Sequence, residues 1–238
     1  MNTFERLYSE LRAKEQRIYS DTELSLLPEI DSKHVHYKEW KIREQSARQL
    51  IAYLSKRKEV LNLLEVGCGN GWLAAKLAEI NKMEVTGIDV SRTEVAQAKR
   101  VFKKNNLQFK WMHFEAEEFN ETKFDVIVFA AAIQYFPSLK KTIKAAQQCL
   151  AKGGEIHILD THFYNGTNLK AAILRTEAYY QQSGYNELDN YYFHHLWTDL
   201  NEFNFKILFN PKTIVNRLTK RSPFYWICIN ETVSISHL

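Results

Sequence analysis

The stretch that decides the fold reads Leu63-Leu64-Glu65-Val66-Gly67-Cys68-Gly69-Asn70-Gly71-Trp72-Leu73. An apolar run with strand character leads into three glycines spaced two residues apart, and a helical pattern follows. Glycines permit a tight turn and carry no Cβ, so a ligand can contact backbone N–H groups at the positive end of the following helix. The segment therefore predicts a strand, a loop and a helix that together form a nucleotide-type pocket.

A second element follows one strand later. The run Val85–Val90 has strand character, and its acid, Asp89, stands eighteen positions after Gly71. That offset is close to the ~20 residues at which a strand-end carboxylate accepts hydrogen bonds from both ribose hydroxyls. A dinucleotide loop would need glycine in place of Trp72, and the Gly-Lys-Ser/Thr of a P-loop does not follow. The two elements therefore predict an adenosine-bearing ligand without a pyrophosphate.

Around these elements, short apolar runs alternate with stretches of helical periodicity, which is typical of successive βα units and a parallel sheet. The pattern predicts five strands joined by four crossovers, hence a doubly wound sheet, at residues 60–66, 84–89, 108–112, 124–130 and 155–159. Two further strands are expected at 204–209 and 224–231.

Helices are predicted before, between and after these strands, including 4–18, 42–54, 139–150 and 168–182. The first of them keeps its apolar residues on one stripe from Phe4 to Ile18, as an amphipathic helix that packs against a partner would. Ser91 and Glu94 form a capping box at the start of the helix after the second strand. The helix at 139–150 is expected to stop at Gly153–Gly154, where a positive φ costs little.

The composition is that of an ordinary folded protein. Of 238 residues, 45% are hydrophobic and 25% charged, while Gly and Pro number only 8 and 4. The length predicts one large domain, or a domain with an attached cap. The net charge of +4, from 32 Lys and Arg against 28 Asp and Glu, is too small to make nucleic acid the default partner.

The cysteines and the first residues bear on the cellular compartment. Cys68, Cys149 and Cys228 are widely spaced, which favours neither a disulfide framework nor a zinc site and fits a reducing cytosol. The first thirty residues mix both charge signs and lack the apolar core of a secretory signal. The longest uncharged apolar stretch, 126–133, is far shorter than the ~20 residues that cross a bilayer. We therefore expect a cytoplasmic protein without a membrane span.

The central region resembles the class I S-adenosylmethionine-dependent methyltransferases. The shared features are an acid followed by Gly-x-Gly-x-Gly at 65–71, an acid at the end of the second strand, and Leu-x-x-Gly-Gly at 150–154. The resemblance implies a Rossmann-like α/β fold with a doubly wound sheet of about seven strands, mostly parallel with an antiparallel last strand. It also implies an N-terminal helical cap at 1–55 and a methyltransferase core at 56–238, in which 163–200 would form a lid insertion.

By the same resemblance, the cofactor S-adenosylmethionine, with S-adenosylhomocysteine as its product, would bind the glycine loop, the strand-end acids and their neighbours: Glu65, Gly67, Gly69, Gly71, Asp89, Val90, Glu115, Ala116 and Ala130. The glycines would surround the methionine portion, Glu65 would orient its amino group, and Asp89 would bind the ribose diol. Glu115, where the family usually has Asp, would accept from the adenine amino group. The backbones of Ala116 and Ala130 would contact the adenine ring and the methionine ammonium.

These residues also have ordinary structural interpretations. Glu65 also fits a hydrogen-bonded strand-end acid, Asp89 a turn residue and Glu115 a solvated loop charge. Cys68 is interpreted as a small buried thiol. No metal site is expected, because the adjacent histidines at 194–195 would face opposite ways on an extended chain. The fourth strand also lacks the terminal acid found in metal-dependent catechol enzymes.

The groups that handle the methyl acceptor are harder to assign. His162 is the predicted general base because imidazole titrates near neutral pH, and Tyr135 or Tyr37 would position the substrate. Alternatively, Tyr37 or Arg43 would contact the cofactor carboxylate. The residues 130–133 read Ala-Ala-Ala-Ile, where the amino methyltransferases of nucleic acid and protein glutamine carry Asn/Asp-Pro-Pro and an aromatic residue.

The expected activity is therefore O- or N-methylation of a small molecule, with a lid made by the cap and the aromatic-rich stretch 179–197. Alternatively, the cap and this stretch are both homodimer surfaces. A non-catalytic cofactor-binding or partner protein is a further alternative. An RNA methyltransferase is another, although nucleic acid is not the favoured partner; it is suggested by five bases without an intervening acid, namely Lys206, Lys212, Arg217, Lys220 and Arg221.

Overall fold

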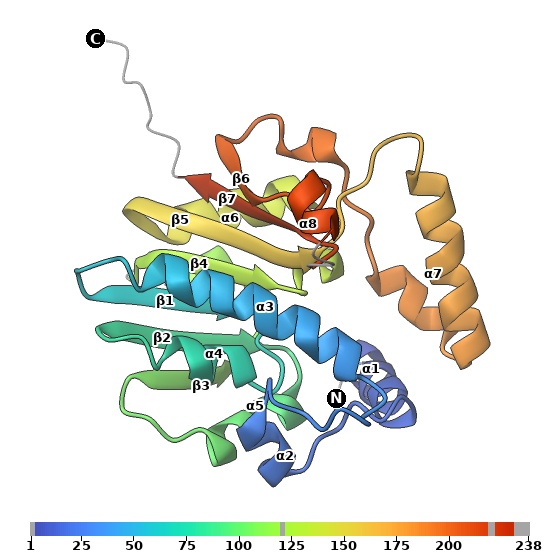
Figure 1. The fold of residues 1–238 in the computed structure, drawn as a ribbon, viewed down its shortest axis with the longest axis horizontal. Coiled ribbons are helices and arrows are strands. Elements are labelled where there is room, and N and C mark those ends of the chain that lie inside the picture. Colours follow the sequence, from blue (N-terminus) through green and yellow to red (C-terminus); the bar gives the residue numbers. More distant parts are fainter. Residues whose placement is uncertain (1–2, 120–121, 219–221, 231–238) are drawn as a thin grey trace.

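The computed structural model describes residues 3–119, 122–218 and 222–230. Seven strands form one sheet in the order β3-β2-β1-β4-β5-β7-β6 (Figure 1). They are β1 Leu61–Val66, β2 Met83–Asp89, β3 Leu107–Trp111, β4 Phe124–Ala130, β5 Leu150–Thr161, β6 Phe205–Phe209 and β7 Tyr225–Asn230. β7 pairs antiparallel with β5 and β6, and the other pairs are parallel. The predicted Rossmann-like sheet, with its antiparallel last strand, is confirmed.

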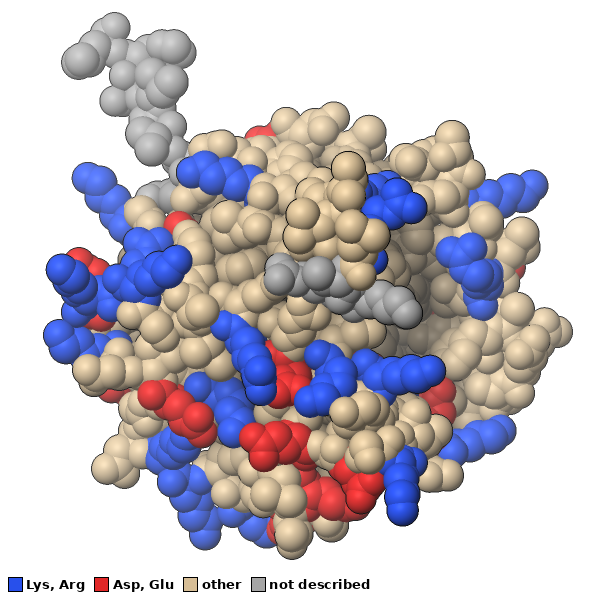
Figure 2. All heavy atoms as spheres, viewed as in Figure 1, with Lys and Arg blue, Asp and Glu red and all other residues tan. Residues whose placement is uncertain are grey.

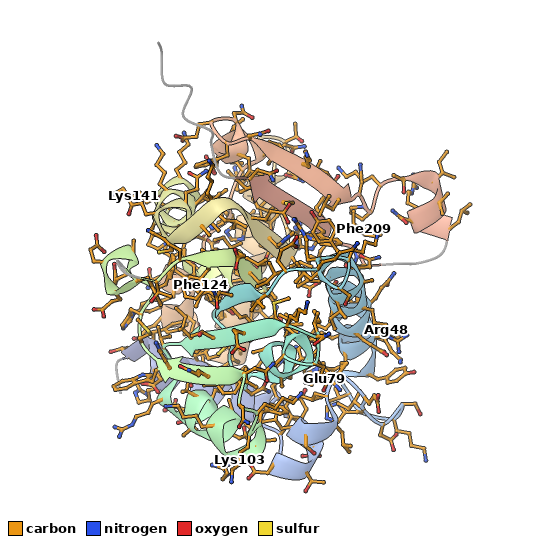
Figure 3. The ribbon with its side chains drawn as sticks, turned by 90° about the vertical axis from the view of Figure 1, so that its left-hand side faces the viewer. Arg48, Glu79, Lys103, Phe124, Lys141 and Phe209 are labelled. Atoms are coloured by element: carbon orange, nitrogen blue, oxygen red, sulfur yellow. The ribbon has the colours of Figure 1, made fainter. Side chains whose placement is uncertain are left out.

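Helices cover both faces of this sheet. The α-helices are α1 Thr3–Lys14, α2 Asp21–Leu26, α3 Tyr37–Leu54, α4 Trp72–Leu77, α5 Arg92–Val101, α6 Leu139–Cys149, α7 Leu169–Ser183 and α8 Ile214–Leu218. Short 3₁₀ helices are η1 Ala116–Phe119, η2 Ile133–Tyr135, η3 Asn186–Tyr191 and η4 Trp197–Leu200. Helices α3, α4 and α5 pack on one face and α6 on the other, so Arg48 of α3 and Lys141 of α6 lie on opposite sides of the sheet (Figure 3).

The alternation of side chains along β4 shows why its sequence is almost continuously apolar. Val126 and Val128 pack into the core under α3, α4 and α5, whereas Ile127 and Phe129 pack into the core under α6. All four side chains are at most 3% exposed. A strand covered on both faces has no solvated side, so it shows an apolar run instead of alternating polarity.

The strand order reverses between β1 and β4, and this reversal positions the site. Where the loops after two adjacent strands run in opposite directions, a crevice forms outside the carboxyl ends of those strands. Ligands bind in this crevice in open α/β sheets. Here the glycine loop after β1 faces the turn after β4. The two approach so closely that a Cβ added to Gly67 would lie 2.6 Å from the Cβ of Ala132.

The first helix packs against segments that lie more than 150 residues later in the chain. Leu7 and Leu11 of α1 form a small buried cluster with Tyr180 of α7 and Leu188 of η3. The Lys14 side chain also donates to the carbonyl of Ser183, at 2.8 Å. The expected partner of the N-terminal amphipathic helix is therefore the segment after β5, and α1 and the lower end of α7 lie at the same side of the sheet (Figure 1).

Two predicted helix ends are wrong. The first helix stops at Lys14 instead of residue 18: Gln16 adopts a positive φ of 57°, and Ile18 is 63% exposed. The helix predicted over 139–150 ends at Cys149, and Leu150 already begins β5, which extends to Thr161. Gly153, with φ of 77°, lies within that strand, so the glycine pair shapes the strand and does not end the helix.

Smaller differences concern a cap and the last strand. The Ser91 hydroxyl accepts from the Glu94 N–H as predicted, but the Ser91 N–H donates to Asp89 and not to Glu94. Of the two hydrogen bonds of a capping box, the one from the Glu94 N–H is therefore present, and in the other Asp89 takes the place of Glu94 as the acceptor. The predicted end of the last strand at Glu231 lies outside the described residues. None of the helices in the described part of the chain has the length and apolar character that crossing a membrane requires.

Candidate cofactor and acceptor site

A cavity of about 410 Å³ opens at the carboxyl ends of the central strands. Its walls come from the loops after β1, β2, β3 and β4, from the tip of β5, and from α1 and α3. The cavity therefore occupies the crevice that the strand order creates, and it is lined by both apolar and charged groups. A concave site with convergent polar groups is the normal form of a small-molecule pocket.

Asp89 connects the end of β2 to the glycine loop. Its Oδ2 accepts a hydrogen bond from the backbone N–H of Gly69, and its Oδ1 accepts one from the N–H of Ser91, both at 2.8 Å. Burial raises the pKa of this carboxyl group, and the nearby Glu94 adds to the shift, while the N–H donors oppose it. Each oxygen retains a second lone pair, so the carboxylate can hold the loop and also accept from a ligand hydroxyl.

The glycines have two different functions in this loop. Gly67 and Gly69 line the cavity with φ of 74° and 51°, a backbone region that favours glycine. Gly71, predicted to bind the cofactor, does not line the cavity. It precedes α4 with φ of 79°, and an added Cβ would lie 2.5 Å from the ring of Phe109 and 2.8 Å from the Cβ of Ala98. Close packing therefore explains the third glycine.

Glu65 is a buried acid whose surroundings lack a partner for one of its oxygens. The residue is only 3% exposed, lines the cavity, and its Oε2 has no hydrogen-bond partner among the described residues. Burial raises the pKa of Glu65 to about 8, although a hydrogen bond with the backbone of Ala74 opposes the shift. A buried acceptor without a donor is costly unless a ligand supplies one. The site therefore fits a ligand that brings a cationic donor.

Of the remaining residues predicted to bind the cofactor, some line the cavity and one does not, as was the case for the glycines. Val90, Glu115 and Ala130 line the cavity. Ala116 is buried in η1 and is not part of the lining. The structure thus brings the strand-end residues together at one cavity, whereas Gly71 and Ala116 support it from outside.

Of the three residues predicted to handle the acceptor, one lines the cavity. Tyr135 lies in its wall, in an environment whose burial raises the pKa of the phenol. Tyr37 begins α3 outside the lining, with Lys41 over its ring. His162 is exposed, its ring 4.5 Å from that of Phe224, and it lines neither this cavity nor the adjoining one. The structure therefore places Tyr135 in the cavity wall and leaves Tyr37 and His162 outside it.

Helix α1 supplies cavity residues that the sequence analysis did not identify. Phe4, Tyr8 and Arg12 are four residues apart, so they share a helix face, and that face closes the cavity. The ring of Tyr8 lies 5.4 Å from Phe4 and 5.8 Å, edge-on, from Tyr135. The i, i+4 spacing indicates that these three residues share one face of the helix. Which part of the protein that face contacts depends on the packing of α1 against α7.

Three arginines line the same cavity and differ in their pairing. Arg17 and Arg43 share the carboxylate of Glu39, at 2.7 Å and 3.0 Å. Arg12 lies 3.9 Å from Glu94, and its Nε is buried with no hydrogen-bond partner among the described residues. Arg43, an alternative cofactor contact in the sequence analysis, is thus in the wall together with Trp40 of the same helix.

Asp160 stands at the tip of β5, where the cavity meets a smaller one of about 350 Å³. Its Oδ1 accepts a hydrogen bond from the hydroxyl of Ser46 in α3, at 2.6 Å. Burial raises the pKa of Asp160 to about 6, with the Ser46 hydrogen bond opposing the shift. The carboxyl group therefore lies between the expected cofactor side and the outer cavity.

A second group of titratable side chains lies on the sheet away from the cavity. Glu155, His157 and Cys228 are buried, with potential ligand atoms within 4.8 Å of one another. The Trp226 indole donates to Nδ1 of His157 at 3.1 Å, so the proton of the neutral imidazole is on Nε2, which faces Glu155 at 3.5 Å. Arg57 pairs with Glu155 at 2.8 Å. The lone pair of Nδ1 then accepts from Trp226 and Nε2 carries the proton, so His157 has no free lone pair for a metal ion in this arrangement.

The surface charges do not form one continuous basic face in the view of Figure 2. Lys and Arg side chains are interspersed with Asp and Glu over its lower half. Of the five bases that suggested RNA, Lys206, Lys212 and Arg217 are described, and Lys220 and Arg221 lie outside the described residues.

Comparison with known proteins gives a family match over most of the chain. A family model described as a methyltransferase domain matches residues 39–209. The match covers α3, all five parallel strands of the predicted core and the insertion after β5.

Curated relatives align with part of the chain. Malonyl-[acyl-carrier protein] O-methyltransferase of Acetivibrio thermocellus is 29% identical over 116 residues, which cover 48% of this chain and 41% of that protein. The tRNA U34 carboxymethyltransferase of Nautilia profundicola is 31% identical over 107 residues, which cover 44% of this chain and 35% of that protein. The chain thus spans less than half the length of either relative.

Solved structures resemble the whole chain. The magnesium protoporphyrin IX methyltransferase of Synechocystis PCC 6803, crystallised with bound SAM, superposes with a TM-score of 0.60 at 13% identity. The superposition covers 98% of this chain and 99% of that one. At this identity the likeness establishes a shared fold.

Proposed function

The chain belongs to the methyltransferase domain family, whose model spans well over half of it, and from this premise we propose that it methylates a small molecule. S-adenosylmethionine is the methyl donor. Three buried cysteines without a disulfide are consistent with action in the cytoplasm. The cofactor residues are those of the cavity wall, and residues 1–55 and 163–200 act as its cap and lid on the core at 56–238.

The observation that carries this proposal is the unpartnered oxygen of Glu65. It is buried at the cavity beside the glycine loop, whose N–H groups donate within the protein: Gly67 to Ile88, Gly69 to Asp89 and Gly71 to Cys68. An α-ammonium group supplies the donor that Glu65 lacks, and a ribose diol supplies donors to the free lone pairs of Asp89. The ligand therefore needs a nucleoside and an amino-acid portion, without a pyrophosphate.

The bound donor supplies a methyl group on a positively charged sulfur, which is transferred by in-line displacement. The protein's contribution is placement: holding donor and acceptor near attack distance can supply on the order of 7 to 11 kcal/mol of the barrier. The rings of Tyr8 and Tyr135, 5.8 Å apart, close the cavity on the side of α1 and exclude water. Tyr135 is retained as a contact for the acceptor.

The aromatic side chains over the cavity support a small acceptor. Phe4, Tyr8 and Tyr191 come from the cap and from η3 and lie over the strand ends. A folded RNA would have to displace this cover to bring a base to the cavity. A second candidate is RNA methylation. It is supported by the five bases between Lys206 and Arg221 and by the relative named as a tRNA U34 carboxymethyltransferase.

Calorimetry with S-adenosylhomocysteine tests the cofactor assignment. We expect Asp89→Ala to weaken binding at least tenfold, because both the loop anchor and the ribose acceptor are lost. Asp31→Ala, at an exposed acid outside the cavity, is the matched control and should bind normally. Equal affinity of the two variants would refute the site.

Methyl transfer to a panel of metabolites and to RNA then separates the activities. We expect labelled methyl groups on a metabolite, with little dependence on salt. A product on RNA whose yield falls steeply with salt would favour RNA methylation, because phosphate contacts release counterions. Tight cofactor binding without a product on any acceptor would favour a non-catalytic binding protein.

A further inference from the structure

The carboxyl ends of the strands present their functional groups in a fixed order across the sheet. From β3 to β5 these are Glu115, Asp89, the glycine loop, Ala130 and Asp160, because the strand order is β3-β2-β1-β4-β5. If Asp89 receives the ribose, as the proposed function requires, the adenine lies toward β3 and the methionine portion toward β4. Asp160 then lies on the side from which the acceptor must approach.

Two strained residues build this side of the cavity. Ala131 and Asp160 have φ of 52° and 54°, although neither is glycine. The N–H of Ala131 donates to the carbonyl of Leu159 at 3.0 Å, so the two strained positions are held next to each other across β4 and β5. Residues in such conformations persist only where their surroundings hold them, and they cluster at functional sites. Here the result is that a carboxyl group is turned toward the cavity.

The charges around Asp160 leave it able to accept a proton. The groups that face it come from α3: Ser46 donates to Oδ1, while Arg43 and Glu39 act on it through their charges. Arg43 is engaged by Glu39 at 3.0 Å, so it is not a dedicated counter-ion for Asp160. The Ser46 hydrogen bond uses one lone pair, and the carboxylate retains further acceptor sites.

From this geometry we propose that Asp160 is the general base of the methyl transfer, and that the acceptor is a hydroxyl or an amine that must lose a proton. The inference rests on the proposed function. A lone pair of the acceptor oxygen or nitrogen forms the new bond to the methyl carbon, and the carbon–sulfur bond breaks with its electron pair left on sulfur. The proton of the acceptor moves to the carboxylate of Asp160. A carboxylate acceptor has no proton to lose and would be repelled there.

The acidity of the group agrees with this assignment. Because burial raises the pKa of Asp160 to about 6, the carboxyl group is ionised at neutral pH and is a stronger base than an ordinary aspartate. The sequence predicts His162, two residues later, for this role. Asp160 has a positive φ where the pairing register of β5 shifts, between Ile158 and Thr161, and it lines the cavity, whereas the exposed His162 packs its ring against Phe224.

The first experiment needs no knowledge of the acceptor. Sinefungin carries an amine at the position of the transferable methyl group, whereas S-adenosylhomocysteine carries nothing there. We expect the protein to bind sinefungin at least about tenfold more tightly at pH 7.5, because Asp160 pairs with that amine. In Asp160→Asn this preference should fall about tenfold while the affinity for S-adenosylhomocysteine is unchanged.

The Asn variant is a mild one, because asparagine tolerates a positive φ and its amide oxygen still accepts from Ser46. Glu177→Gln, at an exposed acid of α7, is the control and should leave the preference unchanged. Ser46→Ala removes a hydrogen bond to the charged form of Asp160. It should therefore shift the pH dependence of sinefungin binding upward.

The possible failures are distinguishable. If Asp160→Asn weakens both ligands equally, or leaves their ratio unchanged, Asp160 does not face the methyl position and the inference is wrong. If the wild-type protein binds neither ligand, the proposed function fails first and takes the inference with it. Matched phenols, amines and carboxylic acids in a labelled-methyl assay give the second test: transfer to the carboxylic acids alone would overturn the assignment of acceptor class.

Discussion

At the scale of single residues, the site depends on acids kept out of water. Glu65 and Asp89 lie one strand apart, and burial raises the pKa of both carboxyl groups. Gly69, in the loop after the strand that carries Glu65, donates its N–H to Asp89, and a Cβ added to Gly69 would lie 3.3 Å from a carboxylate oxygen of Glu94. In the free protein these carboxyl groups therefore hold protons, and Glu65 has an oxygen without a donor. A cationic ligand can displace the proton of Glu65 and donate to that oxygen.

Proton release on ligand binding tests this description. The pKa of Glu65 is about 8 in the free protein, so the group is mostly protonated at pH 7. An ammonium group beside it favours the charged form and lowers the pKa. We expect S-adenosylhomocysteine to release about one proton at pH 7, measured by calorimetry in buffers of different ionisation enthalpy. Glu65→Gln should release much less, and proton uptake by the wild-type protein would contradict the assignment.

At the scale of elements, helix α1 lines the cavity along one face, and its first turn is attached to the start of α5. Glu5 is 4% exposed, and its side chain accepts from the backbone N–H of Arg92 at 2.7 Å, at the first residue of α5. A carboxylate at the start of a helix satisfies a free N–H group and interacts favourably with the helix dipole. This contact ties the cover of the cavity to the strand-end acid, since α5 begins just after Asp89.

Removing that contact should loosen the cover more than the core. We expect Glu5→Ala to cost about 1 kcal/mol of stability and to weaken S-adenosylhomocysteine binding a few-fold. Hydrogen exchange should accelerate in α1 but not in β1 or β4. Glu10→Ala, at an exposed acid of the same helix paired with Arg6, is the matched control. Equal exchange in α1 for the two variants would show that Glu5 does not hold the helix.

At the scale of the whole molecule, the buried acids give the ligand-free protein a stability that depends on pH. Folding raises the pKa of Glu65 from 4.5 to about 8, so above pH 4.5 the folded state binds a proton that the unfolded state releases. Stability therefore falls as the pH rises toward 8 and levels off beyond it. Folding lowers the pKa of His157 and His195 by burial, which has the opposite effect below about pH 6.5.

The contribution of Glu65 to the pH dependence of stability is therefore clearest above pH 6.5, where the histidines no longer oppose it. We expect the free energy of unfolding to fall by on the order of 1 to 2 kcal/mol between pH 6.5 and 8.5, measured by urea denaturation at constant ionic strength. Glu65→Gln should reduce this dependence. Saturating S-adenosylhomocysteine should also reduce it, because the ligand binds the ionised acids. A stability that rises over this interval would contradict the burial of these groups as acids.

The local sequence by itself determined the sheet, the glycine loop and the acid that follows it. Strands β1 and β4 are largely apolar because both faces of the sheet are covered, and a positive φ favours glycine at Gly67 and Gly69, so these signals are present in a few adjacent residues. The helix ends after Lys14 and Cys149 were less predictable, because the following segments join tertiary structure that no local pattern specifies.

Which side chains line the cavity depends on tertiary packing. Arg12 reaches the cavity because α1 packs on α7 and η3, and Asp160, a residue of β5 with a positive φ, lines it whereas His162 does not. Both outcomes depend on contacts between segments far apart in the chain. A strand can be predicted from the polarity of its own residues. An active-site wall is assembled from several elements, and packing fixes their relative placement.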